Sequence, residues 1–241
     1  MPAHQAQDTL EAAVKSVQAQ TFGDWELLLV VDALSRDRTA EIAKKLAAAD
    51  PRICLIGGLP RGGCAYNRNA AMRLARGRYL AFLDSDDLWR PGKLERQLAA
   101  MQERQATLSC TAYGWMHADG RAHPHVHRPP PEIGFAQMLQ RNWMGCLTVM
   151  IDLQHFPNLE FREELHEDYI LWLELTKTDQ ALGLQENLAT YRLGHQTRSS
   201  NKIKSSWAHW RILCRYGNVG FFRRFILFVI YSIKSLLDRL G

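Results

Sequence analysis

The stretch RGRYLAFLDSDDLW, residues 76–89, carries the strongest structural signal in this chain. Its apolar part, RYLAFL (78–83), has the length and composition of a buried strand. Asp84, Ser85, Asp86 and Asp87 follow at once. Carboxylates this close repel one another, and each is costly to bury unless a cation neutralises it. The stretch therefore predicts a buried strand that ends at a cation-binding rim of a sheet.

Helical and strand-like segments alternate at short intervals before this stretch. Helices are predicted over 8–22, 37–50 and 63–77, and strands over 25–31 and 52–57. Short apolar runs separated by helical segments are typical of βαβ units. The sequence therefore predicts an α/β fold with a doubly wound, mostly parallel sheet flanked by helices.

The alternation becomes less regular after Pro91. Further helices and strands are predicted in the order helix 93–104, strand 107–117, helix 135–142, strand 146–152, helix 167–178 and strand 188–193. The segment HPHVHRPPPE (123–132) is predicted to be an irregular loop, because proline has no N–H to donate. Its alternating His123, His125 and His127 could bind a transition metal. The interleaved prolines, with no cysteine or carboxylate nearby, favour a solvated loop instead.

Aspartates follow two of the predicted strands, since Asp32 comes directly after the strand at 25–31. Ligands of an open α/β sheet bind beyond the carboxyl ends of its strands. Grouped carboxylates there suit Mg²⁺ or Mn²⁺, which prefer oxygen ligands and leave positions for phosphate oxygens. The alternative is that the aspartates cap the helix after Pro91 and are merely solvated. No GxGxxG or GxxxxGK[ST] loop is present, which weighs against dehydrogenases and P-loop enzymes.

The positive charge of the chain lies near its C-terminal end. From Thr197 onward the sequence has nine Lys and Arg and one Asp, a net charge of +8. The whole chain has a net charge of +5, so residues 1–196 carry −3. The five cysteines include no CxxC pair, which favours reduced thiols in a cytosolic compartment. The polar start predicts no signal peptide, and the apolar run at 225–233 is too short to span a bilayer.

The order of several short motifs resembles that in the family 2 glycosyltransferases of bacterial surface polysaccharide and lipopolysaccharide synthesis. The catalytic domain of this family has the GT-A fold. The matching segments are SVQAQTFGDWELLLVVDALSRDRT (16–39), RGGCAYNRNAA (61–71), GRYLAFLDSDDLW (77–89), LTVMIDL (147–153), EDYILWLEL (167–175) and YRLGHQTRSSNK (191–202). The resemblance covers nearly the whole chain to about residue 205. It implies the GT-A fold for residues 1–205, with the first strand missing, and leaves 206–241 as a basic amphipathic helical tail.

The resemblance also implies roles for individual residues. Asp168 matches the catalytic base, with Glu167 beside it, and Asp84 and Asp86 match the DxD motif that binds the metal and the diphosphate. Asp87 is a further helper of that motif. The residues implied to bind the nucleotide-sugar are Pro2, Ala3, Asp32, Arg68, Asp84, Ser85, Asp86, Arg192 and His195.

These roles imply an inverting, metal-dependent hexosyl- or N-acetylhexosaminyltransferase that uses Mg²⁺ or Mn²⁺. The donor is a nucleotide-sugar, with UDP favoured, and the acceptor is a hydroxyl of a glycan or a lipid-linked glycan. The loop with the three histidines is expected near that acceptor. A catalytically weak homologue that acts as a membrane-associated interaction module is the alternative.

The chain departs from the family pattern in two places. Asp32-Ala33-Leu34 replaces the usual Asp-Asp-Gly, which removes one carboxylate that would contact the base of the nucleotide. The sequence begins at Met1-Pro2, where the family has already completed its first strand, so a start further upstream or a truncated form is expected. In the tail, aromatics interleave with Arg and Lys, which favours peripheral contact with anionic lipid on the cytoplasmic face of a membrane. The other interpretation is a helix pair packed on the catalytic domain. No nucleic-acid motif is present.

Overall fold

The computed structural model describes residues 1–194, 202–217 and 219–237, and the strands lie in two sheets. The first sheet is parallel, in the order β1-β2-β3, and consists of β1 (Pro2–Ala3), β2 (Leu27–Val31) and β3 (Ile53–Ile56). The strand expected to be missing is therefore present as two residues, Pro2 and Ala3, paired with Val30 and Val31.

The second sheet is mixed and larger. Its main path is β4-β9-β6-β10-β5, with β7 paired to β6 and β8 to β10. Its strands are β4 (Tyr79–Ala81), β5 (Leu88–Trp89), β6 (Leu108–His117), β7 (Ala122–His127), β8 (Glu132–Ile133), β9 (Met150–Asp152) and β10 (Ala181–Leu193). Only the β6–β10 pair is parallel among the described pairs of this sheet. The prediction of a mostly parallel sheet thus holds for the first sheet and not for the second.

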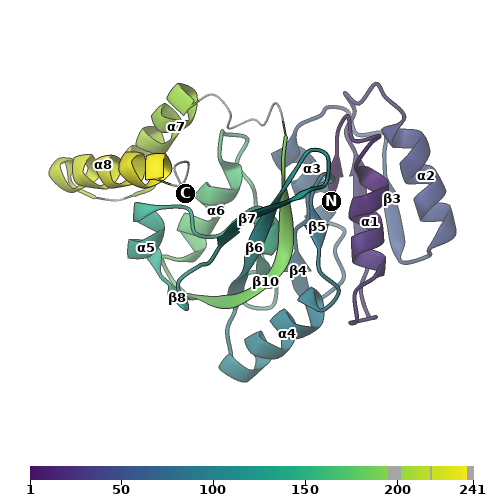
Figure 1. Cartoon of the computed structure of the whole chain (residues 1–241), viewed down its shortest axis with the longest axis horizontal. Coiled ribbons are helices and arrows are strands. Elements are labelled where there is room, and N and C mark those ends of the chain that lie inside the picture. The colour runs from purple at the N-terminus through teal and green to yellow at the C-terminus, as the bar shows by residue number, and fades with distance from the viewer. Residues whose placement is uncertain (195–201, 218, 238–241) are drawn as a thin grey trace.

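Helices flank both sheets, and Figure 1 shows them from one end of the molecule to the other. They are α1 (Leu10–Gln18), α2 (Thr39–Ala49), α3 (Cys64–Met72), α4 (Lys93–Arg104), α5 (Phe135–Gln140), α6 (Glu167–Leu175), α7 (Lys202–Arg215) and α8 (Phe221–Leu237). Every helix predicted from the sequence is present, and the structure shortens most of them by a few residues.

Two of the predicted elements are wrong. The segment expected to be an irregular loop forms β7 and β8, because an edge strand that pairs on one side tolerates Pro124. The segment expected to be one strand, 146–152, begins with the 3₁₀ turn Cys146–Thr148, and only Met150–Asp152 is extended.

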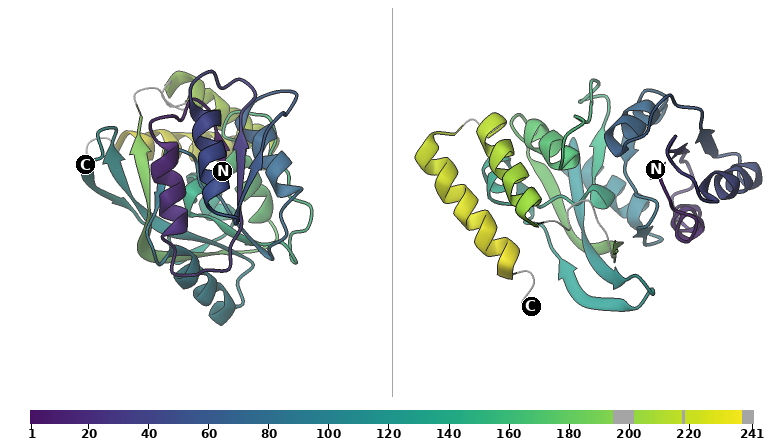
Figure 2. Two further views of the ribbon diagram at one scale, coloured as in Figure 1. Left: turned by 90° about the vertical axis from the view of Figure 1, so that its right-hand side faces the viewer. Right: turned by 90° about the horizontal axis from the view of Figure 1, so that it is seen from above.

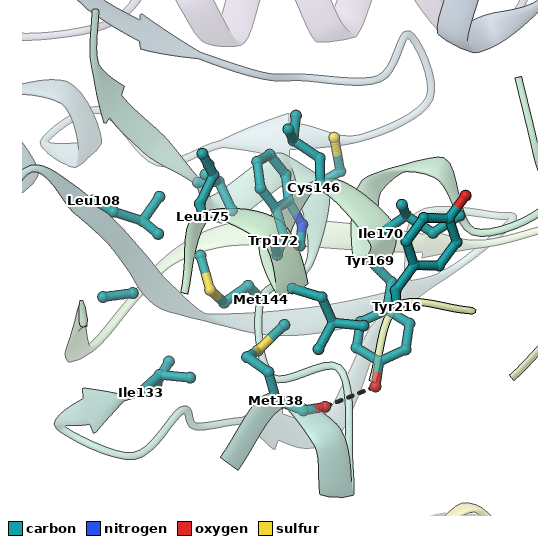
Figure 3. Close-up of a cluster of buried hydrophobic side chains, with 14 of the residues drawn as sticks. Leu108, Ile133, Met138, Met144, Cys146, Tyr169, Ile170, Trp172, Leu175 and Tyr216 are labelled. Atoms are coloured by element: carbon teal, nitrogen blue, oxygen red, sulfur yellow. Dashed lines mark hydrogen bonds between the residues drawn. The ribbon is translucent and has the colours of Figure 1, made fainter. Parts of the chain in front are cut away.

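The largest hydrophobic cluster is built around α6, which is apolar on nearly all sides and therefore buried. Figure 3 shows Trp172 and Tyr169 of this helix among Met138, Met144 and Ile170, with the Tyr169 hydroxyl donating to the Met138 carbonyl at 2.7 Å. Trp172 is completely buried. Such packing fixes the start of α6 in space.

The C-terminal helices pack on this same cluster through Ile212, Leu213, Tyr216 and Leu227. In both views of Figure 2, α7 and α8 lie against the rest of the domain. The domain boundary predicted after residue 205 falls inside α7. The alternative interpretation of the tail, a helix pair packed on the catalytic domain, is therefore what the structure shows for the described part of α7 and α8. Within the described residues, no helix combines the length and the apolarity needed to cross a bilayer.

Candidate active site

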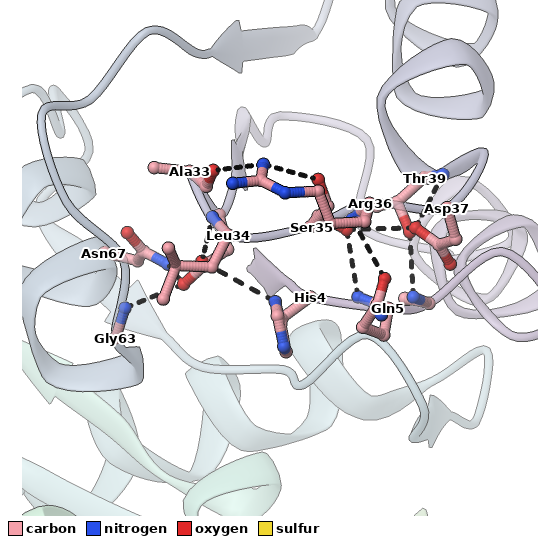
Figure 4. Close-up of polar contacts among 12 residues, drawn as sticks. His4, Gln5, Ala33, Leu34, Ser35, Arg36, Asp37, Thr39, Gly63 and Asn67 are labelled. Carbon is pink, nitrogen blue, oxygen red and sulfur yellow. Dashed lines mark hydrogen bonds and ion pairs between the residues drawn. The ribbon is translucent and has the colours of Figure 1, made fainter.

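Asp32 lies directly after β2 and is almost completely buried. Its carboxylate accepts hydrogen bonds from the backbone N–H of Leu34 (2.8 Å), the backbone N–H of Gly63 (2.7 Å) and the Asn67 amide (2.7 Å). Leu34, Gly63 and Asn67 lie close together in Figure 4. Burial alone would raise the pKa of Asp32, but the three donors outweigh it and hold the pKa below its usual value. Asp32 is therefore a fixed carboxylate.

The loop before α3 approaches Asp32 so closely that only glycine fits. A Cβ on Gly62 would lie 2.2 Å from Asp32 Oδ1, and Gly63 has φ 122°, in the region that favours glycine. On the other side, the Ala3 carbonyl accepts the Asp32 N–H at 2.9 Å. Ala3 is completely buried, so it supports Asp32 from behind and has no surface for a ligand.

Arg68 joins the two predicted functional motifs. From α3 it donates to Asp84 Oδ1 at 2.5 Å and to Glu167 Oε1 at 3.1 Å, while its side chain is only 6% exposed. The guanidinium also lies over the Phe161 ring, 5.3 Å from its centroid. Asp84 and Glu167 raise the pKa of Arg68 well above its usual value despite burial. In this structure Arg68 is therefore the cation that neutralises Asp84 of the DSDD stretch.

The rest of the DSDD stretch is held by β10. The Arg192 backbone N–H donates to Asp87 Oδ1 at 2.9 Å, and its guanidinium donates to the carbonyls of Asp86 (2.9 Å) and Ala118 (3.1 Å). Burial, then repulsion from its neighbours, raises the pKa of Asp86 and, far more, that of Asp87. Arg192 thus holds the loop through backbone contacts, and Ser85 is buried within it.

The predicted base stands at the first turn of α6. Burial, and secondly repulsion from Glu167, raises the pKa of the Asp168 carboxyl to about 6. The residue before the helix, His166, has a left-handed backbone with φ 63°, which is uncommon for a non-glycine residue and recurs at functional sites. A carboxyl with such a pKa can accept a proton near neutral pH and release it again.

One cavity of about 200 Å³ collects these groups. Its lining consists of Asp84, Asp87, Tyr113, Trp115, Gly145, Cys146, Leu147, Asp168 and Tyr191. Asp84 and Asp168 come from segments 84 residues apart in sequence, and the fold brings them to one space. The aromatic lining was not singled out from the sequence, because Trp115 and Tyr191 become neighbours only through the parallel pairing of β6 with β10.

The donor set at Asp84 and Asp86 fits a divalent cation that binds together with a diphosphate. Burial and then the nearby charge of Asp84 raise the pKa of Asp86, and carboxylate oxygens are the ligands that Mg²⁺ and Mn²⁺ prefer. No third His, Cys, Asp or Glu completes a cluster among residues 1–194, 202–217 and 219–237. Mg²⁺ commonly binds through one or two carboxylates and takes its other ligands from phosphate and water.

Several other predicted residues are placed as follows. Pro2 lies in β1 beside β2, and His195 is outside the described residues. The histidines of β7 stack on rings of β6, and His127 is buried with its Nε2 3.2 Å from the Trp143 carbonyl oxygen. The expected solvated loop is therefore wrong for this segment. His4 was missed by the sequence analysis, and its Nδ1 lies 3.6 Å from Asp32 Oδ1.

The chain belongs to glycosyl transferase family 2, whose model matches residues 1–153. The glycosyltransferase TuaG of Bacillus subtilis (strain 168), named for teichuronic acid biosynthesis, is 36% identical over 99% of this chain and 95% of its own. The Escherichia coli enzyme WfgD, a UDP-Glc:alpha-D-GlcNAc-diphosphoundecaprenol beta-1,3-glucosyltransferase, is 35% identical over 88% of this chain and 83% of its own. The predicted family is confirmed.

Solved structures confirm the predicted GT-A fold. S. aureus TarS in complex with UDP-GlcNAc has a TM-score of 0.70 at 16% identity, over 96% of this chain and 70% of that one. The mannosyltransferase PcManGT from Pyrobaculum calidifontis in complex with GDP-Man and Mn²⁺ has a TM-score of 0.69 at 15% identity, over 95% of this chain and 67% of that one. At these identities the likeness concerns the fold.

Proposed function

We propose that this chain is an inverting glycosyltransferase that moves a sugar from a UDP-sugar to a hydroxyl of a lipid-linked glycan, in the synthesis of a surface polysaccharide. The observation that carries the proposal is the shared cavity, in which Asp168, with a pKa raised to about 6, lines the same space as Asp84. The names of TuaG and WfgD support a polysaccharide product, and that of WfgD supports a UDP-sugar donor and a diphosphate-linked acceptor.

The nucleotide side of the site is built from fixed polar groups. The Asn67 Oδ1 and the Arg68 Nε are buried and have no hydrogen-bond partner in the described structure, although both residues are otherwise well held. Buried polar atoms without partners are rare and are often satisfied by a ligand. A nucleotide lying between Asp32 and Arg68 would supply an N–H donor to Asn67 Oδ1 and an acceptor oxygen to Arg68 Nε.

The acceptor side of the reaction centres on Asp168. Its carboxylate takes the proton of the acceptor hydroxyl, and that oxygen forms a bond to the anomeric carbon while the bond to the diphosphate breaks. The departing nucleoside diphosphate keeps the electron pair of the broken bond. One base and one in-line displacement invert the anomeric configuration, so a second nucleophilic carboxylate is not needed.

The leaving group is received on the opposite side of the cavity. A divalent cation held by Asp84 and Asp86, Mg²⁺ or Mn²⁺, would supply positive charge to the diphosphate. Arg68 neutralises Asp84 and Glu167 and keeps both carboxylates in place. Arg192 fixes the loop that carries Asp86. These contacts pre-organise the site before the donor arrives.

A panel of nucleotide-sugars tests this function, with released nucleotide as the readout and Mn²⁺ or Mg²⁺ present. We expect turnover with a UDP-sugar and a diphosphate-linked acceptor. The Asp86→Ala variant should lose about 100-fold or more in kcat/KM, the size found for removing one charge-stabilising group. Asp119→Ala, which changes an exposed aspartate paired with Arg121, is the matched control.

Two results would speak against the proposal. A folded protein that binds neither UDP nor any other nucleotide, with or without metal, would exclude it. A protein that binds UDP with metal but turns over no donor would favour a catalytically weak homologue that serves as an interaction module.

We also propose that α8 lies on an anionic membrane surface, where a lipid-linked acceptor resides. Five apolar side chains are exposed along this helix, namely Phe221, Phe222, Phe225, Ile226 and Val229, and Phe222 is 81% exposed. Nearby, a cavity of about 600 Å³ is lined by Lys177, Arg215 and Arg224 and, among the residues that the structure describes, by no acidic one. Exposed aromatics beside basic groups are typical of helices that lie in a lipid interface.

Co-sedimentation with phosphatidylglycerol vesicles tests this contact. We expect the wild-type chain to bind these vesicles and to bind phosphatidylcholine vesicles more weakly. Replacing Phe222 and Phe225 together by serine should abolish binding, whereas Trp207→Ser, at an exposed aromatic of α7, should not. Equal binding of wild type and the double variant would contradict the proposed role of this face.

A further inference from the structure

A row of rings on β6 and β7 extends from the catalytic cavity. It consists of Tyr113 and Trp115 on β6 and of His123, His125 and His127 on β7, and is called the ring wall below. The ring centroids of Trp115 and His125 are 4.4 Å apart, those of Tyr113 and His127 5.0 Å, and those of Trp115 and His123 5.4 Å. The wall is thus one packed layer.

The ring wall is continuous with the site already described. Tyr113 and Trp115 line the same cavity as Asp84 and Asp168, and Tyr191 of β10 extends the wall with its ring centroid 6.4 Å from that of Tyr113. The cavity, at about 200 Å³, is smaller than the pockets of about 300–1,000 Å³ that enclose drug-sized ligands. It has room for little more than one ring, and a longer molecule would continue along the wall.

We propose that the ring wall is the binding surface for the acceptor, and that Trp115 stacks against the pyranose ring that carries the attacking hydroxyl. This inference rests on the glycosyltransferase function proposed above. A pyranose has an apolar C–H face that matches an aromatic ring, and hydroxyls at its edge that match ring nitrogens. The wall supplies both kinds of group within one layer.

The position of the wall favours the acceptor over the donor. The groups proposed to contact the nucleotide directly, Asp32, Asn67 and Arg68, come from residues 1–72. The carboxylates proposed to hold the diphosphate through a metal, Asp84 and Asp86, lie in the loop after β4. The wall comes from β6 and β7 and shares its cavity with the base, Asp168. In an in-line displacement the acceptor enters from the side of the base.

Trp115 also has an unused donor. Its indole Nε1 is buried without a hydrogen-bond partner in the described part of the chain, although its ring is well packed. A buried indole N–H normally finds a partner, so an absent one points to a ligand that supplies an acceptor oxygen. A sugar hydroxyl is such a group.

The test uses the full chain with UDP and Mn²⁺ present and a soluble probe, an α-linked N-acetylglucosamine diphosphate carrying a short alkyl chain. Calorimetry gives the Kd of the probe, and a separate titration gives the Kd of UDP. We expect Trp115→Ala to raise the Kd of the probe at least about tenfold, as for a buried aromatic anchor, and to leave the Kd of UDP unchanged. Trp115→Phe should keep most of the affinity.

Two further variants separate ligand binding from folding. His125→Ala removes the ring that packs on Trp115 and should raise the Kd and the KM of the probe with little change in kcat. Trp25→Ala is the matched control, because its indole Nε1 is also buried without a partner but packs on Arg52, outside the cavity. It should lower the melting temperature without changing the Kd of the probe.

The outcomes distinguish the inference from the function on which it rests. If wild type binds UDP with Mn²⁺ but not the probe, the inference is overturned and the proposed function stands. If Trp115→Ala and His125→Ala leave the Kd of the probe unchanged, or weaken the binding of UDP as strongly as that of the probe, the rings only stabilise the β6–β7 pair. If wild type binds no nucleotide, the proposed function itself fails.

Discussion

Two aspartates at the site show opposite responses to burial. In the donor half, defined as residues 1–90, Asp32 accepts three hydrogen bonds and its pKa is lowered. In the acceptor half, residues 91–194, Asp168 shares a cavity with Tyr113, Trp115 and Tyr191, and its pKa is raised to about 6. The same residue type thus provides a permanent charge in one half and, as proposed above, a proton acceptor in the other.

The difference follows from the local backbone. Asp32 ends a parallel strand, where the turn and the neighbouring loop present free N–H groups to the carboxylate. Asp168 lies in the first turn of a helix, which favours a negative charge. Its carboxyl group is nevertheless desolvated and is repelled by Glu167, and these two effects raise its pKa. Environments that push the pKa values of two carboxyls apart separate binding from acid–base chemistry.

The largest effect is expected from Asp168→Asn, which removes the proton acceptor of the acceptor half. We expect kcat to fall about 1,000-fold, within the range for a lost general base, and the affinity for UDP and Mn²⁺ to stay as in wild type. Steady-state kinetics and calorimetry measure the two quantities. Glu174→Gln, at the same helix but paired with exposed Arg162, should leave kcat unchanged.

The same variant should also be more stable than wild type at pH 8. The ordinary pKa of this carboxyl is 3.8 and the folded value is about 6, so the folded state binds the proton more tightly than the unfolded state does. Folding stability is therefore lost as pH rises from about 4 to about 6, and Asn avoids this loss. A melting temperature below that of wild type at pH 8 would contradict the assigned environment.

The second effect concerns the buried arginine that joins the halves. Arg68→Met leaves Asp84 and Glu167 without their cation, so the free energy of unfolding should fall by about 3 kcal/mol, as when one partner of a buried pair is removed. Urea unfolding measures it. Arg162→Met, which breaks an exposed pair with Glu174, should cost less than about 1 kcal/mol. Equal losses in the two variants would show that Arg68 is not the central cation.

The donor half was predicted from sequence more completely than the acceptor half. Asp32 and Asp84 follow local apolar runs, so both residues could be identified from patterns of a few residues, although β4 pairs with β9 in the second sheet and not with β2. The contact of Arg68 with Glu167 spans 99 residues and no local pattern contains it. The sequence identified both residues and missed that one neutralises the other.

The ring wall shows what could not be predicted from the sequence in the acceptor half. Proline and histidine predicted a loop over 123–132, but β6 has ten residues and supplies a long edge on which β7 can pair despite Pro124. Trp115 and Tyr191 meet because β10 runs parallel to β6 over a register interrupted by bulges between Leu184 and Ala189. Pairing between strands so far apart in sequence is a tertiary property.

The third prediction uses pH to separate the two aspartates. Because Asp168 must be ionised to accept a proton, kcat/KM should fall about tenfold per pH unit below about pH 6. The Kd of uridine, measured without metal, should not follow this limb, since Asp32 has a lowered pKa and stays ionised. In Glu167→Gln the acid limb should move to lower pH, because the repulsion that raises the pKa of Asp168 is gone. A limb that stays in place would assign it to another group.

The smallest effect is expected from an exposed ion pair between the halves. Arg61 precedes α3 and bonds to Glu163, which precedes α6, but their side chains are 56% and 48% exposed. Water screens such a pair, so Arg61→Ala should change the free energy of unfolding by less than about 1 kcal/mol. A double-mutant cycle with Glu163→Ala isolates the coupling between the two side chains from the contact of Arg61 with Tyr66.

The kinetics of Arg61→Ala test whether the exposed Arg61–Glu163 pair matters less for the site than the buried Arg68. Because the β4–β9 and β5–β10 pairs and the buried Arg68 already hold the halves together, kcat and KM of Arg61→Ala should match those of wild type within error. A rise in the KM of the donor with unchanged stability would instead show that the exposed pair holds the 57–63 loop over the nucleotide. The loop would then act as part of the donor site, and Gly62 and Gly63, which already contact Asp32, would connect that loop to the fixed carboxylate.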